Sequence, residues 1–436
     1  MTRQINSVAV IGGGTMGAGI AGKCADAGCR VLLIDKDEAA VAKAMERVTG
    51  GRMPAIDNPE SAKLIETATF DQLDRIAGFD WICEAIIEDL ETKRALFEKL
   101  EALRSEGSVV STNTSGIPLR SIVEGLPQRL RRDVVVTHFF NPVKVMRLLE
   151  VVPGEDTTPD VVAAMARFGA EKLGKGVVHA KDTVNFIGNR IGCFWMLSGL
   201  HKARAARAKG LSMETIDALM SAPVGLPSTG LYGLIDLIGL DVMDFVGKNL
   251  AVNLPADDVG RDFTSFPAEV QAMFDAGQLG RKSGGGFYRV TKTEDGAKLK
   301  ETFDLDADDW RHTREPELLP AHHELASLMT APDACGDFAR DLMGGTLFYA
   351  ADLVPQIADD IVNIDRAMRW GFAWKKGPFE MLDDLGPAAV AADMKARGQG
   401  LPAMLAVLDQ AGATSFYRND GSEYLGYDGG WHKVPA

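Results

Sequence analysis

A histidine and a glutamate stand twelve positions apart in an otherwise apolar part of the chain. His138 follows the three valines at 134–136, and Glu150 lies inside an expected apolar strand, residues 148–152. A buried carboxylate without a partner is costly, and a neighbouring imidazole would supply that partner. Such a pair makes chemical sense as a general base, in which the histidine removes a hydroxyl proton and the carboxylate stabilises the imidazolium. From the pattern alone, a histidine satisfied inside the core is an equally good interpretation.

A glycine-rich turn near the amino terminus has the layout of a dinucleotide-binding site. Gly12 permits a tight turn, Gly14 lets the backbone approach a pyrophosphate, and Gly17 lets the next helix pack on the preceding strand. The free N–H groups at the start of that helix are suited to bind phosphate. The predicted cofactor residues of this turn are Gly12, Gly14, Thr15, Met16 and Gly17.

The second strand of this layout ends in an acid. Asp35 lies 23 residues after Gly12, where it is placed to accept hydrogen bonds from ribose hydroxyls and would repel a 2′-phosphate. The pattern therefore favours NAD over NADP as the cofactor. FAD, which is bound by a similar first unit, stays open as an alternative.

The elements that must position these residues alternate up to about Asp182. Short β-branched runs and helical stretches predict a mostly parallel sheet covered by helices. His138 then lies at the carboxyl end of a strand, where such sheets bind ligands. Beyond Asp182 the strand signals almost vanish and helices are expected. The expected strands are 8–11, 31–34, 81–85, 108–111 and 134–137, and the expected later helices are 186–208, 213–220, 231–250 and 338–361.

The helical half contains a possible internal repeat. Residues 230–239 (GLYGLIDLIG) resemble residues 377–386 (GPFEMLDDLG), and each stretch follows a similar Ile-Asp segment. Two copies of one helical unit are therefore expected, joined by a charged linker and followed by a polar tail that forms a short hairpin or a linker. The predicted boundaries are 1–185 for a nucleotide-binding domain, 186–290 for the first helical domain, 291–332 for the linker, 333–412 for the second helical repeat and 413–436 for the tail.

The composition limits the class of protein. The 436 residues carry 47 Lys and Arg against 61 Asp and Glu, a net charge of −14, which argues against general binding of nucleic acid or of an anionic membrane. Five scattered cysteines lack metal-ligand spacing and indicate a reducing cytosol without a metal site. Residues 1–7 are too short and polar for a signal peptide, and no apolar run reaches the roughly eighteen residues of a membrane span. A soluble, cytoplasmic protein is expected.

Several linked motifs resemble those of the L-3-hydroxyacyl-CoA dehydrogenase family, over nearly the whole chain. The motifs are the glycine turn with Asp35, Ser111–Ser115 (STNTS), His138–Pro142 (HFFNP) with Glu150, Lys181–Thr183 leading into Phe186–Arg190 (FIGNR), and Gly280–Tyr288 (GRKSGGGFY). The resemblance implies an α/β Rossmann-like NAD-binding domain followed by two all-α C-terminal domains of the type found in 6-phosphogluconate dehydrogenase.

The resemblance also assigns roles to single residues. It makes His138 the catalytic base with Glu150 as its partner, and it makes Ser115 and Asn189 the groups that contact the reacting oxygen. The implied reaction oxidises the 3-hydroxyl of an L-3-hydroxyacyl-CoA to the ketone, as in fatty-acid β-oxidation, with the hydride passing to NAD+. Further residues that match cofactor positions near the nicotinamide are Glu88, Lys93, Asn113 and Asn141.

Two features depart from the short members of that family. Residues 50–59 contain Gly and Pro where those members carry a longer helical hairpin that helps to hold CoA, so no CoA contact is assigned. The repeated helical unit resembles the larger bacterial enzymes in which an enoyl-CoA hydratase part is joined to the dehydrogenase, so a fused or partner hydratase is possible in a longer parent chain. The second copy lacks its own glycine turn and His–Glu pair, which indicates scaffolding.

Three questions stay open at this point. The second helical copy could pack on the first as a pseudo-dimer within a monomer, in place of the homodimer of the short members. The substrate could be a hydroxy acid without CoA, in which case acyl-CoA would not stabilise the protein against unfolding. The chain could also be a non-catalytic NAD-binding protein, which would bind NADH without turnover.

Overall fold

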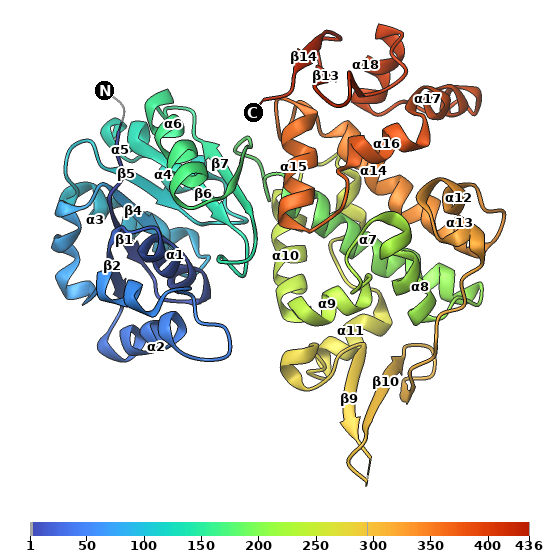
Figure 1. Ribbon diagram of the computed structural model, residues 1–436, viewed down its shortest axis with the longest axis horizontal. Coiled ribbons are helices and arrows are strands. Elements are labelled where there is room, and N and C mark those ends of the chain that lie inside the picture. Colours follow the sequence, from blue (N-terminus) through green and yellow to red (C-terminus); the bar gives the residue numbers. More distant parts are fainter. Residues whose placement is uncertain (1–2, 294, 436) are drawn as a thin grey trace. The chain divides into compact units, whose positions relative to one another are not determined.

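The computed structural model describes residues 3–293 and 295–435, which form two compact units (Figure 1). The first unit runs to Ile187 and also includes 356–359, and the second holds the other described residues. Residues 1, 2, 294 and 436, which belong to the predicted first domain, linker and tail, lie outside the described residues.

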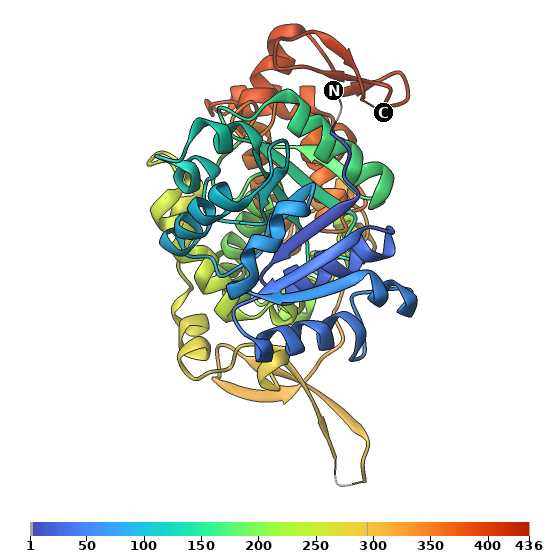
Figure 2. The same cartoon turned by 90° about the vertical axis from the view of Figure 1, so that its left-hand side faces the viewer.

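The first unit is built on an eight-stranded sheet with the order β3-β2-β1-β4-β5-β6-β7-β8, part of which faces the viewer in Figure 2. Neighbouring strands are parallel except β6 and β7, which are antiparallel. The predicted, mostly parallel sheet is confirmed. Its strands are β1 (Ser7–Ile11), β2 (Arg30–Asp35), β3 (Ile65–Thr69), β4 (Trp81–Glu84), β5 (Val109–Thr112), β6 (Val134–Phe139), β7 (Leu148–Pro153) and β8 (Gly176–His179).

The central strands are predictable because every residue of β1, β4, β5 and β6 is buried, and continuous apolar runs are typical of parallel strands covered on both faces. The pattern missed β3 and β8, which carry exposed residues and lie at the two edges of the sheet. The helices of this unit are α1 (Thr15–Asp26), α2 (Glu38–Thr49), α3 (Leu90–Leu103), α4 (Leu119–Val123), α5 (Gln128–Asp133) and α6 (Pro159–Arg167).

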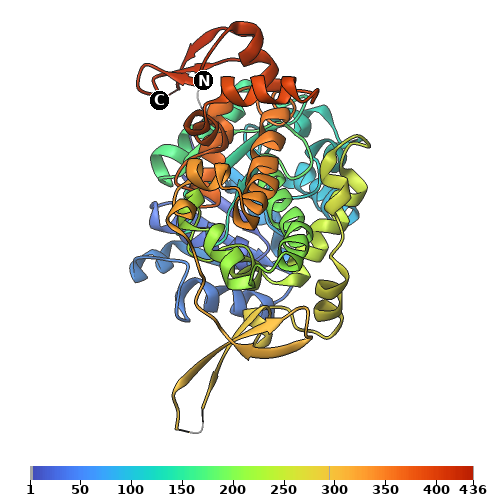
Figure 3. The same ribbon diagram turned by 90° about the vertical axis from the view of Figure 1, so that its right-hand side faces the viewer.

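The second unit is mainly helical, and α7 (Gly188–Ala208) packs against α10, α13, α14 and α15 within it (Figure 3). None of the helices in the described residues has the length and hydrophobicity needed to cross a lipid bilayer. The other helices are α8 (Met213–Leu219), α9 (Tyr232–Ile238), α10 (Leu240–Asn253), α11 (Ala268–Asp275), α12 (Leu325–Thr330), α13 (Ala334–Ala339), α14 (Gly345–Asp352), α15 (Ile361–Gly371), α16 (Pro378–Leu385), α17 (Pro387–Ala396) and α18 (Ala403–Ala411).

Two of the long helices expected from the sequence are interrupted. The expected helix 231–250 breaks at Gly239, which adopts a φ of 102° that favours glycine. α9 ends before this residue and α10 begins after it. The expected helix 338–361 breaks before Pro355, which has no N–H to continue a helix. The chain then passes through 356–359 in the first unit and re-enters a helix at Ile361. In both cases the predicted extent of the helix is wrong.

The region expected to be a linker contains a three-stranded antiparallel sheet. It consists of β9 (Tyr288–Lys292), β10 (Lys298–Asp304) and β11 (Asp309–His312), and the β9–β10 ribbon projects from the helices in Figures 1 and 3. Charged residues of this sheet form ion pairs across strands. For example, the Nε atom of Arg289 lies 2.7 Å from Oε2 of Glu301. These pairs explain why a charged segment forms a sheet here.

The first half of the second unit contains a half-buried carboxylate that accepts three hydrogen bonds. Asp217 accepts hydrogen bonds from the backbone N–H groups of Tyr232 and Gly233 and from the hydroxyl of Tyr288. It therefore ties α8 to the start of α9 and to β9.

The second half repeats this arrangement with different residues. Asp365 accepts from the backbone N–H groups of Phe379 and Glu380 and from the hydroxyl of Tyr417. Tyr417 belongs to the segment expected to be a tail, which forms a second small sheet. That sheet consists of β12 (Tyr417–Arg418), β13 (Glu423–Leu425) and β14 (Trp431–Lys433). The segment is thus tied to Asp365 of α15.

Candidate active site

His138 and Glu150 lie directly opposite each other on the antiparallel strands β6 and β7. The Nδ1 atom of His138 is 2.6 Å from Oε2 of Glu150, and the two side chains are only 5% and 0% exposed. Directly opposite residues on one face of an antiparallel pair bring their side chains into contact. The structure therefore joins the two residues that the sequence analysis paired.

The hydrogen bond leaves the other ring nitrogen of His138 available. Because Nδ1 faces a carboxylate, we assign the ring proton to Nδ1 and the lone pair to Nε2. No hydrogen-bond partner of Nε2 occurs among the described residues. The rings of Phe140 and Phe186 lie 4.6 and 5.6 Å from the imidazole and form an apolar wall. The second oxygen of Glu150 accepts the N–H of Ile187 at 3.1 Å.

A buried lysine forms hydrogen bonds with the loop that connects β6 and β7. The Nζ atom of Lys175 donates to the backbone carbonyls of Val143 and Met146. Burial lowers the pKa of Lys175 to about 8, because the charged form is poorly solvated there. At the end of β6, the N–H of Phe139 donates to Oδ1 of Asn113 at 2.9 Å. These contacts fix the strand ends that carry the His–Glu pair.

Glu88 holds the loop that carries Ser115. Its Oε1 atom accepts hydrogen bonds from the hydroxyl of Thr114 at 2.6 Å and from the N–H groups of Ser115 and Gly116 at 2.9 Å. Burial opposes ionisation, but the charge of Lys93 and these hydrogen bonds hold the pKa of Glu88 below its usual value. The Ser115 hydroxyl is half-buried and has no hydrogen-bond partner among the described residues. Glu88 thus positions a loop that presents an available hydroxyl.

Lys93 contacts Glu88 and is almost fully buried. Its Nζ atom is 2.7 Å from Glu84 and 3.2 Å from Glu88, and its side chain is 1% exposed. Glu84 also accepts the hydroxyl of Thr112. Sequence reasoning missed Glu84, although a carboxylate that ends the apolar strand Trp81–Glu84 is the same kind of signal that singled out Glu150. In this structure Lys93 supports Glu88 and is shielded from direct contact with a ligand.

The glycine turn has the conformation that its spacing predicts. Gly12 has a φ of 99°, and a Cβ atom there would lie 2.5 Å from the carbonyl oxygen of Ala85. A Cβ atom on Gly17 would lie 1.7 Å from the carbonyl oxygen of Gly12. In contrast, a Cβ atom on Gly14 would meet nothing within 4 Å. The turn is therefore closely packed against the backbone at Gly12 and Gly17, and it leaves open space beside Gly14, as a bound pyrophosphate requires.

Two hollows flank this turn on the first unit. One, of about 320 Å³, lies between Gly14 and Asp35. Asp35 is half-buried, and its Oδ2 atom accepts the N–H of Gly13 at 2.8 Å. The other hollow, of about 370 Å³, is lined by Thr15 and Asn141 among others. Open space at the helix start and a carboxylate at the end of β2 fit the diphosphate and ribose of NAD.

Asn189 is the one predicted catalytic residue outside the first unit. It is half-buried in the first turn of α7, in the second unit. The other three predicted catalytic residues, His138, Glu150 and Ser115, all belong to the first unit.

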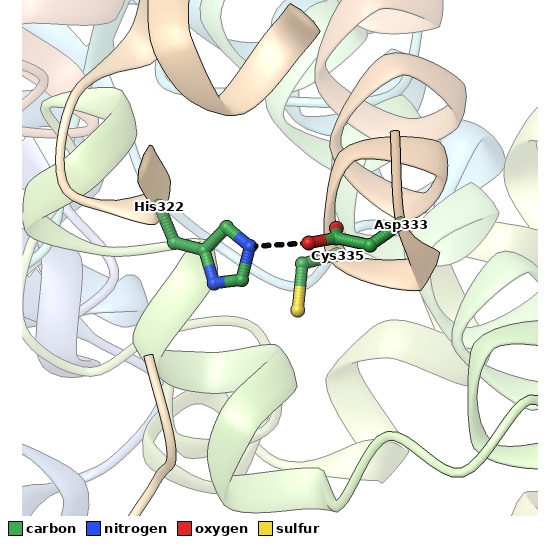
Figure 4. A group of neighbouring side chains, drawn as sticks. All are labelled: His322, Asp333 and Cys335. Atoms are coloured by element: carbon green, nitrogen blue, oxygen red, sulfur yellow. Dashed lines mark hydrogen bonds and ion pairs between the residues drawn. The ribbon is translucent and has the colours of Figure 1, made fainter. Parts of the chain in front are cut away.

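A second histidine cluster, His322, Asp333 and Cys335, has ligand atoms within 4.8 Å of one another (Figure 4). The Nδ1 atom of His322 accepts the N–H of Leu319 at 3.1 Å, so the ring proton lies on Nε2 and points at Asp333. A metal at Nε2 would need the opposite tautomer. Asp333 also accepts the N–H of Gly336 as the N-cap of α13. The cluster is therefore built as a helix cap.

Comparison with known proteins agrees with the geometry. Residues 7–183 match the NAD binding domain of 3-hydroxyacyl-CoA dehydrogenase, and residues 186–290 match its C-terminal domain. The first of these matches defines an NAD-binding domain, so the prediction of NAD as the cofactor is confirmed.

The chain is similar to several proteins along most of its length. A probable 3-hydroxyacyl-CoA dehydrogenase of Deinococcus radiodurans is 39% identical over 67% of this chain and 84% of the relative. A putative fatty acid oxidation complex trifunctional enzyme of Rickettsia felis is 33% identical over 88% of this chain and 53% of the relative. A crystal structure of 3-hydroxybutyryl-CoA dehydrogenase from Escherichia coli has a TM-score of 0.67 and 25% identity, and it covers 91% of this chain and 96% of that one.

The chain belongs to the 3-hydroxyacyl-CoA dehydrogenase family, a family of NAD-dependent oxidoreductases. The resemblance drawn from the motifs is thus confirmed. The chain spans between 53% and 58% of the length of the longer curated relatives that it matches.

Proposed function

We propose that this protein is a dehydrogenase that oxidises the 3-hydroxyl of an L-3-hydroxyacyl-CoA to the ketone. His138 is the general base, and its Nε2 atom takes the hydroxyl proton. Glu150 keeps the ring proton on Nδ1 and stabilises the imidazolium that forms. When bound, NAD+ accepts the hydride that leaves C3.

One observation carries this proposal more than any other. The 2.6 Å hydrogen bond from His138 to a fully buried Glu150 leaves Nε2 without a partner among the described residues. A histidine that served only the core would have both nitrogens satisfied, because buried polar atoms are normally hydrogen-bonded. An apolar wall of two phenylalanines then strengthens the electrostatic interaction of the pair by excluding water.

The remaining predicted residues receive supporting roles. We assign Ser115 and Asn189 to the reacting oxygen, where their polar groups would hold the hydroxyl and stabilise its developing charge. Glu88 positions the Ser115 loop, and we now assign Lys93 as its support in place of a direct cofactor contact. The cofactor residues proposed on the first unit are Gly12, Gly14, Thr15, Met16, Gly17, Asp35, Asn113 and Asn141.

We also propose how the helical part of the chain is organised and which partners the protein has. The repeated hydrogen bonds at Asp217 and Asp365 support two copies of one helical unit, with the second copy extending to the carboxyl-terminal sheet. Such a pair within one chain favours a monomer. The similarity to a putative fatty acid oxidation complex trifunctional enzyme supports fused or partner activities in fatty-acid oxidation. We propose an enoyl-CoA hydratase as that activity and the cytoplasm as the location.

The test is the decay of NADH absorbance with acetoacetyl-CoA, run beside acetoacetate without CoA. We expect decay with the thioester alone. Equal rates with acetoacetate would indicate a hydroxy-acid dehydrogenase that does not use CoA. No decay with either compound, despite measurable binding of NADH, would indicate a non-catalytic NAD-binding protein.

A further inference from the structure

The second unit contains a closed ring of three buried side chains next to Asn189. The Nε atom of Arg190 donates to the hydroxyl of Tyr349 at 2.6 Å, and that hydroxyl donates to Asp258 at 3.1 Å. Arg190 also forms an ion pair with Asp258, and their side chains are 1% and 5% exposed. Burial raises the pKa of Tyr349, so its hydroxyl keeps its proton and can donate.

The three residues come from distant parts of the chain. Arg190 lies in the first turn of α7, and Asp258 is the N-cap of the 3₁₀ helix Val259–Phe263. Tyr349 lies in α14, which belongs to the second helical copy. The ring therefore ties the start of α7 to the second copy.

Two further contacts from the second copy hold the same end of α7. The ring of Tyr349 stacks on Phe194, with centroids 4.0 Å apart. Phe372 lies so close to Gly192 that a Cβ atom there would be 2.1 Å from its ring. Because helix packing of this density leaves no room for adjustment, α7 cannot rotate or slide without losing these contacts. Asn189 lies one residue before Arg190, so its direction depends on them.

We propose that Tyr349 is a positioning residue for the dehydrogenase reaction. Through Arg190 it fixes the first turn of α7 and thereby the direction of the Asn189 amide. This inference rests on the proposed function, in which Asn189 contacts the reacting oxygen. The second helical copy then takes part in organising the active site, whereas the sequence analysis assigns it scaffolding alone.

The test begins with Tyr349→Phe, which removes only the hydroxyl. We expect kcat for the reduction of acetoacetyl-CoA to fall about 10-fold, as loss of a hydrogen bond to a charged group allows. The Kd for NADH should stay unchanged, because the cofactor residues lie in the first unit. The matched control is Tyr417→Phe, since Tyr417 also donates to a buried carboxylate of the second copy, Asp365. Its kcat should stay within about 2-fold of the wild type.

A double-mutant cycle with Asn189→Ala separates positioning from a general loss of stability. If Tyr349 acts through Asn189, Tyr349→Phe has little further effect once Asn189 is removed. Additive losses, or a Tyr349→Phe enzyme as fast as the wild type, would overturn the inference. If Tyr349→Phe does not fold, Asp258→Asn enters the same cycle with the same expected coupling. A wild type without turnover overturns the proposed function and this inference together, whereas an active wild type with additive losses overturns only the inference.

Discussion

Two buried histidines of this chain each form a hydrogen bond with a carboxylate through one ring nitrogen. They differ in whether the other ring nitrogen has a hydrogen-bond partner. His138 is 2.6 Å from Glu150, and His322 is 2.8 Å from Asp333. The two residues are 4% and 2% exposed, so burial does not distinguish them. At His322 the second ring nitrogen accepts the N–H of Leu319. At His138 the second nitrogen has no hydrogen-bond partner among the described residues.

This difference separates a candidate base from a structural cap. A histidine with both nitrogens engaged stabilises the fold and has no lone pair for a substrate proton. A histidine held by a carboxylate at one nitrogen keeps the other ready to accept a proton. The second nitrogen, and not the presence of a carboxylate partner, therefore decides which pair can do chemistry.

The largest effect should follow from His138→Ala. In the reduction of acetoacetyl-CoA, His138 would return the proton to the oxygen as a general acid. Without it we expect kcat to fall about 1,000-fold, within the range that general acid–base catalysis contributes. Binding of NADH, followed by its fluorescence, should change little because the glycine turn is untouched. A variant that keeps a tenth of the wild-type activity would contradict the role of His138.

A smaller loss should follow from Glu150→Gln. The amide can still accept the N–H of Ile187, but it carries no charge to stabilise an imidazolium. Its NH₂ group would also face Nδ1 and favour the wrong tautomer. We expect kcat to fall about 100-fold, a smaller loss than the one caused by replacing the aspartate of a Ser-His-Asp protease triad by asparagine. The NADH absorbance assay checks this, and a loss below about 3-fold would remove Glu150 from the mechanism.

His322→Ala should affect stability and leave catalysis intact. The substitution removes two hydrogen bonds and leaves the N–H of Leu319 without its acceptor. We expect the free energy of unfolding to fall by about 1–3 kcal/mol. Urea unfolding measures that loss, and kcat of the folded fraction should match the wild type. A large drop in kcat at unchanged stability would show that the two histidines are not distinguished by their second nitrogen.

The smallest effect concerns the pH dependence of the His322 pair. The N–H of Gly336 and the ring of His322 hold the pKa of Asp333 below its usual value. A lowered carboxylate pKa stabilises the folded state above the unfolded pKa of about 4, and this contribution is lost as the pH falls through the folded value. Asp333→Asn should therefore lose less stability than the wild type on acidification below about pH 5. Urea unfolding at several pH values checks this, and equal slopes would show that the pair has no electrostatic role.

The first unit could be predicted largely from the sequence because its signals are local. The glycine turn, its flanking strands and Asp35 follow one another within the first 35 residues. His138 and Glu150 were paired by their apolar surroundings and by chemistry. Their direct opposition across β6 and β7 could not be seen, because the register depends on the connecting loop that Lys175 holds.

The second unit was harder to predict because its decisive contacts are distant in sequence. Arg190 and Tyr349 are 159 positions apart, and neither residue type suggests the other. The charges of the expected linker favoured a connecting segment, because the sequence alone does not show that β9 and β10 bring Arg289 and Glu301 together. The Gly and Asp spacing predicted a repeated helical unit, whereas the hydrogen bond from Tyr417 to Asp365 joins residues 52 positions apart and could not be predicted.

The most direct test of the central claim follows the hydride itself. Wild-type protein would be incubated with acetoacetyl-CoA and with NADH in which both hydrogens on C4 of the nicotinamide ring are replaced by deuterium. The product would be analysed by mass spectrometry and NMR. The account predicts 3-hydroxybutyryl-CoA with a single deuterium at C3, and no such product from His138→Ala over the same time. An unlabelled product, or deuterium transfer that persists at the wild-type rate without His138, would contradict it.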